Sequence, residues 1–119
     1  MKAIPFFVLS LSLAIALLVP RGARGEGDPV VGEEIYRRLC APCHGFHGDG
    51  GEGYRGGFTP HTPILANKEY VNNLPDEYLI FVIQKGGVAV GKSNQMPAWE
   101  KSLNVEQTKD IIAHIRRLQ

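Results

Sequence analysis

The chain has 119 residues and a formal net charge of +1, which results from 13 basic and 12 acidic side chains. This near-balance of charge gives no basis for binding a nucleic acid. A chain of this length is expected to form one domain with a hydrophobic core of modest size.

Residues 1–25 are predicted to be a signal peptide. Lys2 supplies a positive start, and residues 4–19 form an apolar run that is short for a membrane span. Ala23 and Gly25 place small residues at the two positions that a signal peptidase reads, so cleavage is expected after Gly25. The alternative is an uncleaved anchor. Both possibilities place the rest of the chain outside the cytoplasm, either in the periplasm or attached to the membrane and facing it.

Residues 26–119 then form the exported domain. Without Lys2, Arg21 and Arg24, the 13 basic residues become 10 while all 12 acidic residues remain, so the formal charge becomes −2. A slightly acidic domain again indicates no nucleic-acid partner.

A first helix is predicted to begin after Asp28, an N-cap acid that is followed by proline at the first helical position. Gly32 lies on the apolar face, where a glycine lets another helix approach closely. Pro42 cannot continue a regular helix, so the helix should end near Leu39 or Cys40. The remaining apolar face is made of Ile35, Tyr36 and Leu39.

The sequence Cys40-Ala41-Pro42-Cys43-His44 follows this helix and has the C-x-x-C-H pattern of covalent c-type haem attachment. Each thiol can add to a haem vinyl group, and the histidine can bind the iron. Positions i, i+3 and i+4 lie on one face of a helical turn, so all three groups can meet one porphyrin. We therefore predict one covalent haem with His44 as an iron ligand. Haem attachment in bacterial-type systems occurs outside the cytoplasm, which fits the predicted export.

Three other interpretations of these residues are open. Cys-x-Pro-Cys also resembles a thioredoxin-like redox motif, but that motif needs a preceding strand, and the segment here looks helical. Cys40, Cys43, His44 and His47 could bind zinc, although a second close pair of ligands with finger-like spacing is lacking. The third is a plain disulfide between the two cysteines, which are the only two in the chain.

Residues 45–65 predict irregular backbone. Seven of the 13 residues in 45–57 are glycine, and glycine lets backbone pass close to the edge of a flat cofactor. Asp49 and Glu52 are too few for a calcium site, so a solvated turn is the preferred interpretation. Prolines make residues 59–65 extended, and a carbonyl there could accept the second ring N–H of His44.

Three further helices are predicted, at residues 68–72, 75–85 and 105–118. Asn104 and Gln107 form a capping-box-like pair at the start of the last helix. The inward face of that helix is expected to contain Ile111, Ile112, Ile115 and Leu118.

Residues 86–102 predict a loop that carries Met96-Pro97-Ala98-Trp99. Methionine offers a soft thioether ligand to haem iron, and the alternative is a methionine that fills the core. His47 and His61 are expected on the same side of the haem as His44, and a single histidine on a helix flank, such as His114, is more often a packing or surface residue. Met96 is therefore the predicted sixth ligand.

These residues together resemble class I c-type cytochromes, and they are similar to the haem domains of cbb3-type oxidase subunit III. The resemblance implies an all-α class I cytochrome c fold in which the terminal helices cross and irregular loops cover the haem. It implies His44 and Met96 as the axial iron ligands and Pro63 as the carbonyl partner of His44. His114 departs from the pattern, because relatives usually carry an aromatic residue at this position, where the last helix crosses the first. The matching residues are Gly32, Tyr36, 40–45, 48–50, Pro63, Leu65, Ile83, 86–87, 96–99 and the last helix, and the haem-contacting set is Cys40, Cys43, His44, Pro63, Leu65, Met96 and Trp99.

The function implied by this resemblance is one-electron transfer. With His44 and Met96 on the iron, no position is open for a substrate, so we expect an electron carrier and not an enzyme. Its partners would be respiratory-type redox proteins in small transient complexes with a monomeric carrier. The alternatives are a haem subunit held in a membrane respiratory complex, and a peroxidase-like enzyme or sensor in which Met96 dissociates.

Overall fold

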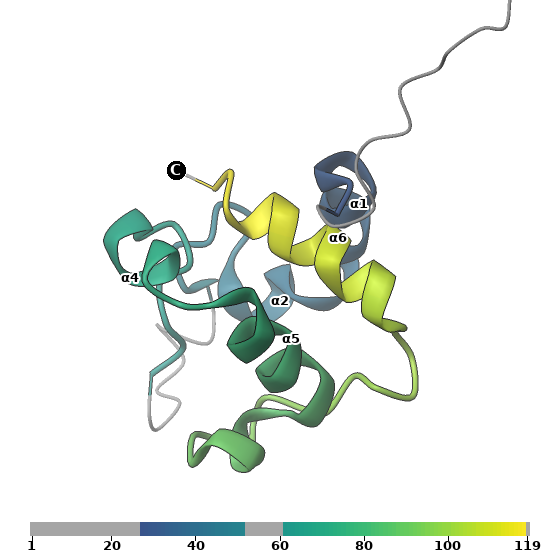
Figure 1. Ribbon diagram of the computed structural model, residues 1–119. Helices are drawn as coiled ribbons and strands as arrows, with labels where there is room; N and C mark the ends of the chain where they lie inside the picture. The colour runs from purple at the N-terminus through teal and green to yellow at the C-terminus, as the bar shows by residue number, and fades with distance from the viewer. Residues whose placement is uncertain (1–26, 52–60, 119) are drawn as a thin grey trace, which may run out of the picture.

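The computed structural model describes residues 27–51 and 61–118, which form helices without strands (Figure 1). The all-α prediction is thus confirmed. No helix in these two described segments is long and apolar enough to cross a membrane. The predicted signal peptide lies outside the described residues. The helices are α1 (Pro29–Leu39), α2 (Ala41–His44), α4 (Lys68–Asn72), α5 (Asp76–Lys85), the 3-10 helix η1 (Gly87–Val90) and α6 (Val105–Ile115).

The start of α1 matches its predicted capping. The Asp28 carboxylate accepts a hydrogen bond of 2.8 Å from the Val30 backbone N–H, and Pro29 occupies the first turn. The Asp28 backbone N–H donates in turn to the Asp110 carboxylate at 2.7 Å, which ties the beginning of α1 to α6. The helix ends at Leu39, as Pro42 requires.

The terminal helices α1 and α6 cross, as predicted (Figure 1), and Gly32 lies at their contact. A Cβ atom added at Gly32 would lie 1.8 Å from the Asp110 carbonyl oxygen and 2.9 Å from the Ile111 nitrogen. The two backbones are therefore in direct contact, with no room for a side chain. Tyr36 and Ile111 are fully buried beside this contact.

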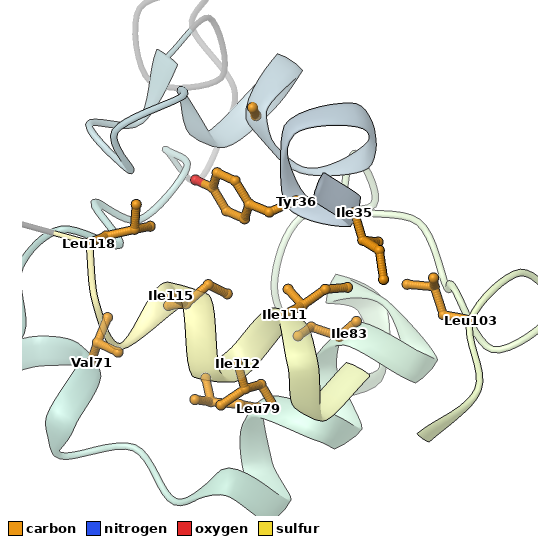
Figure 2. Close-up of a cluster of buried hydrophobic side chains, with 11 residues drawn as sticks. Ile35, Tyr36, Val71, Leu79, Ile83, Leu103, Ile111, Ile112, Ile115 and Leu118 are labelled. Carbon is orange, nitrogen blue, oxygen red and sulfur yellow. The ribbon is translucent and has the colours of Figure 1, made fainter. Parts of the chain in front are cut away.

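The hydrophobic core lies between α1, α5 and α6, and Figure 2 shows their side chains pointing toward one another. The four residues predicted for the inward face of the last helix are all buried. Arg116 fastens α6 to the turn before α5: its guanidinium donates to the Leu74 carbonyl at 2.8 Å and the Val71 carbonyl at 3.1 Å, and it pairs with Asp76. The core contains Ile35, Tyr36, Ala41, Val71, Leu79, Ile83, Leu103, Ile111, Ile112, Ile115 and Leu118.

Three predicted boundaries need correction. The last helix was expected to reach Leu118, but α6 ends at Ile115, because i→i+3 hydrogen bonds tighten the end of the chain and turn Leu118 into the core. Pro75 is the N-cap of α5 and not its first residue, since its backbone is extended. The loop expected at 86–102 contains the short helix η1. The helix at 68–72 and the capping box of Asn104 with Gln107 are confirmed.

The helix crossing yields a first prediction. Gly32→Val should lower the free energy of unfolding by about 1–3 kcal/mol or more, because its side chain has to separate two touching backbones. Denaturant unfolding of the purified protein measures this change. Val30→Ala is the matched control, since Val30 lies on the same helix with 72% of its surface exposed. Equal stability of Gly32→Val and the control would contradict the close crossing.

Candidate functional site

The two cysteines and His44 are brought together by the short helix α2. The Cys40 carbonyl accepts hydrogen bonds from the backbone N–H groups of Cys43 at 3.1 Å and His44 at 2.8 Å. This closed turn places the two sulfur atoms and the imidazole on the wall of one cavity, as their spacing predicts. Both cysteines are free thiols.

The cavity has a volume of about 430 Å³, and its walls are mainly apolar. Sites for small molecules and cofactors typically measure roughly 300–1,000 Å³ and share this apolar character. All of the predicted site residues line it: Cys40, Cys43, His44, Pro63, Leu65, Met96 and Trp99. Segments from three distant parts of the chain therefore converge on a space with the character of a cofactor site.

Tyr36 holds the end of α2 in place. Its ring is fully buried beside α6, and its hydroxyl donates a hydrogen bond of 2.8 Å to the carbonyl of Gly45, the residue after His44. Gly45 ends α2 with a φ of +81°, a conformation that favours glycine. The backbone leaving His44 is thus held by a side chain of the helix crossing.

The glycine-rich loop brings the proline segment next to α2. The Gly48 carbonyl accepts a hydrogen bond of 3.0 Å from the Ala66 N–H, and a Cβ atom at Gly48 would lie 2.9 Å from that same nitrogen. The expected close passage of glycine backbone is therefore found, but against residues 65–66. As a result Pro63 and Leu65 reach the cavity.

The surroundings of His44 favour the neutral form of its imidazole. Burial lowers the pKa of His44 below its ordinary value of 6.5, and the nearby backbone of Pro63 partly offsets this by raising the pKa. The Nδ1 atom is buried without a partner at normal hydrogen-bond geometry. His44 and Pro63 line the same cavity, so the Pro63 carbonyl is the candidate partner for this nitrogen. A neutral imidazole is the form that binds metals.

The thiol chemistry argues against a redox-active dithiol. Burial and, to a lesser extent, the neighbouring Cys43 raise the pKa of Cys40 to about 12. A thioredoxin-like cysteine needs a lowered pKa to attack disulfides as a thiolate. The zinc interpretation also lacks support: His47 is exposed and does not line the cavity, and no cluster of three metal-binding side chains occurs within residues 27–51 and 61–118.

The loop that carries Met96 is attached to the end of α5. The Met96 carbonyl accepts a hydrogen bond of 3.0 Å from the Gly87 N–H, and the Trp99 N–H donates to the Ile83 carbonyl at 3.1 Å. A Cβ atom at Gly86 would lie 2.9 Å from the Met96 oxygen. Two successive glycines therefore let the methionine loop pack directly on the helix end, which fixes Met96 at the cavity.

The other histidines occupy different places. His61 lines the cavity on the same segment as Pro63. His114 packs on Tyr36, with ring centroids 4.9 Å apart, and does not line the cavity, as its expected position beside the first helix implies. His61 is therefore the histidine that has to be tested against Met96 as an iron ligand.

Sequence reasoning missed part of the cavity wall. Tyr78 and Val82 of α5 face the cavity while Leu79 and Ile83 of the same helix also reach the core. In the sequence, Leu79, Ile80, Val82 and Ile83 form a broad apolar stripe on this helix. A stripe of this width indicates that the helix packs against more than one surface. Lys92 also lines the cavity, and nothing in its sequence context indicated this.

Comparison with known proteins agrees with this geometry. Two solved structures share the fold: the KustC0563 c-type cytochrome, with a TM-score of 0.61, 23% identity, and coverage of 74% of this chain and 96% of that one; and cytochrome cL from the marine methylotrophic bacterium Methylophaga aminisulfidivorans, with a TM-score of 0.55, 24% identity, and coverage of 74% and 51%. The fold is that of class I c-type cytochromes.

The family follows from sequence. The family model described as cytochrome c oxidase, cbb3-type, subunit III matches residues 27–115, so the chain belongs to this family. It is 31% identical over 91 residues to the cbb3-type cytochrome c oxidase subunit FixP of Bradyrhizobium diazoefficiens. That match covers 76% of this chain and 28% of FixP, so the chain spans little more than a quarter of that relative. Membership in this cytochrome family implies covalently bound haem c.

The contact between Tyr36 and Gly45 generates a second prediction. Tyr36→Phe should lower the free energy of unfolding by about 1–3 kcal/mol, because the buried Gly45 carbonyl loses its hydroxyl donor while the ring stays in place. Thermal or denaturant unfolding measures the loss. Tyr70→Phe, at a partly exposed tyrosine of α4, is the control and should change stability little. The contact would carry no energy if the two variants unfolded alike.

Proposed function

We propose that this protein is a one-electron carrier with a single covalent haem c. Cys40 and Cys43 form its two thioether bonds, and His44 and Met96 are its axial iron ligands. The supporting observation is that two thiols, one imidazole and one thioether line the same apolar cavity. These are the groups that attachment and His/Met ligation require.

Each side chain has a separate task in this proposal. His44 binds as a neutral imidazole, and the Pro63 carbonyl orients its second ring nitrogen. Met96 provides a soft ligand from the opposite loop, which favours a raised reduction potential. Leu65 and Trp99 exclude water from the cavity. When bound, the haem would supply a one-electron couple, and with His44 and Met96 both held to the iron no position would be left for a substrate.

The proposed location is outside the cytoplasm. Residues 1–25 act as a signal peptide or as an uncleaved anchor, and residues 26–119 form the mono-haem domain in the periplasm or at its membrane face. This rests on the positive start, the apolar run and the small residues before Glu26. The carrier acts as a monomer that meets its redox partners in transient complexes.

A second candidate function is that of a haem subunit held in a membrane respiratory complex. It is favoured by the family match and by the relative whose name is cbb3-type oxidase subunit FixP. Co-purification of the haem protein with a membrane oxidase after mild detergent extraction would favour this candidate over the free carrier. Rapid carbon monoxide binding by the native reduced protein would instead favour an enzyme or sensor with a displaceable ligand.

Covalent attachment gives a third prediction. Protein from cells that can mature c-type cytochromes should retain one haem per chain after denaturation, because thioether bonds survive unfolding. Mass spectrometry measures this directly. Cys40→Ala and Cys43→Ala should each leave one thioether bond and a lower yield, and the double variant should release its haem. A wild-type mass equal to the bare polypeptide would refute the proposal.

The sixth ligand gives a fourth prediction. The oxidised wild-type protein should show the far-red sulfur-to-iron absorption band, and Met96→Ala should lose the band and bind carbon monoxide when reduced. Met96→His should keep the iron six-coordinate and lower the potential, because imidazole stabilises ferric iron more than a thioether does.

His61→Ala is the matched control for the sixth ligand, because His61 lines the same cavity. It should retain the band. Loss of the band in His61→Ala, together with an unchanged spectrum in Met96→Ala, would assign the sixth position to His61 and leave Met96 as a packing residue.

A further inference from the structure

His114 is an ionisable side chain in the packed interface between the terminal helices. Its ring lies 4.9 Å from the ring of Tyr36, measured between centroids, with the planes inclined by 52°. Its Nε2 atom is buried and has no hydrogen-bond partner. An imidazole whose buried nitrogen has no hydrogen-bond partner stabilises this interface no better than an apolar ring would.

Tyr36 connects this imidazole to the haem side of the fold. The tyrosine is fully buried, and its hydroxyl donates to the Gly45 carbonyl at 2.8 Å. Gly45 follows His44 directly in the chain. A single side chain therefore spans the distance from His114 on α6 to the backbone of the proposed iron ligand, through an interior that screens charge weakly.

We propose that His114 is a proton-linked residue that adjusts the reduction potential of the haem, an inference that rests on the proposed ligation by His44. Reduction of the protein takes one electron from a donor protein. At a pH near the two pKa values that His114 has in the oxidised and reduced protein, reduction also raises the fraction of His114 that is protonated, with the protons taken from water. No bond of the haem or of the polypeptide is broken.

The sign of the effect follows from charge. Ferric iron carries one more positive charge than ferrous iron, and a protonated His114 adds a positive charge nearby, so each disfavours the other. The reduced protein therefore holds the His114 proton more tightly than the oxidised protein does. By linkage, the potential is higher when His114 is protonated and falls as the pH rises through its titration.

The surroundings of His114 define the pH range. Burial is the largest influence and lowers the pKa of His114 below its ordinary value of 6.5. Glu33 on α1 raises the pKa, while Arg117 after α6 and Arg37 on α1 lower it. Glu33 and Arg37 also pair with each other at 3.6 Å on the exposed side of α1, so their effects partly cancel. His114 therefore titrates below the ordinary pKa of a histidine.

The test is a redox titration of the holo-cytochrome between about pH 4.5 and 8, the range around histidine ionisation. We expect the His114 dissociation constant to be about threefold larger in the ferric protein, which corresponds to a fall in potential of about 28 mV at 59 mV per tenfold change. His114→Phe keeps a ring against Tyr36 and should remove this fall. His47→Gln, at an exposed histidine, should retain it.

A pH profile that is the same in His114→Phe and in wild type would overturn the inference, because another group would then be titrating. Because a substitution in the helix interface can also destabilise the fold, an NMR titration of His114 in the wild-type protein provides a second measurement. Equal pKa values in the ferrous and ferric states would also overturn the inference. Failure of the proposed haem site would show differently, as a wild-type mass equal to the bare polypeptide or as a missing sulfur-to-iron band.

Discussion

The direct contact of the α1 and α6 backbones at Gly32 is the constraint on which the rest of this structure depends. Because no side chain separates Gly32 from Asp110, the two helices lie close enough for Tyr36 to be buried between them. The Tyr36 hydroxyl then reaches the Gly45 carbonyl and holds the end of α2. The position of the haem-attachment motif is thus set by a contact between opposite ends of the domain.

The methionine side of the site depends on the same pair of helices through α5. Gln84 of α5 donates to the Thr108 hydroxyl at 2.6 Å and to the Leu103 carbonyl at 3.1 Å, which attaches α5 to the beginning of α6. The loop that carries Met96 is in turn bonded to the last turn of α5 and to Gly87. Both walls of the cavity are therefore connected to α6, one through Tyr36 and the other through α5.

The cavity is suited to a cofactor whose charge changes by one unit. Its walls are mainly apolar, and burial lowers the pKa of His44 and so favours the neutral imidazole. Among the lining residues that the structure describes, Lys92 alone carries a permanent charge. In such surroundings a single added charge is weakly screened, which is the condition that the proposed effect of His114 on the haem requires.

Several features could be predicted from the sequence because they depend on residues within one or two turns of each other. The Asp28 cap, the capping box of Asn104 with Gln107, and the common face of Cys40, Cys43 and His44 are of this kind. The crossing at Gly32 could also be predicted, since a glycine on an apolar helix face is itself a sign of close approach. The family resemblance added Pro63, Leu65 and Trp99 to the site, which local patterns alone do not identify.

Other features were decided only by the folded chain. The end of α6 at Ile115 depends on turns that bury Leu118, and Arg116 is held by the Val71 carbonyl, 45 residues earlier in the chain. The division of α5 between core and cavity, and the place of Lys92 on the cavity wall, likewise depend on what packs against each surface. Local hydrogen bonds and side-chain spacing depend on residues that are close together in the sequence, whereas contacts between distant segments form only once the helices have packed.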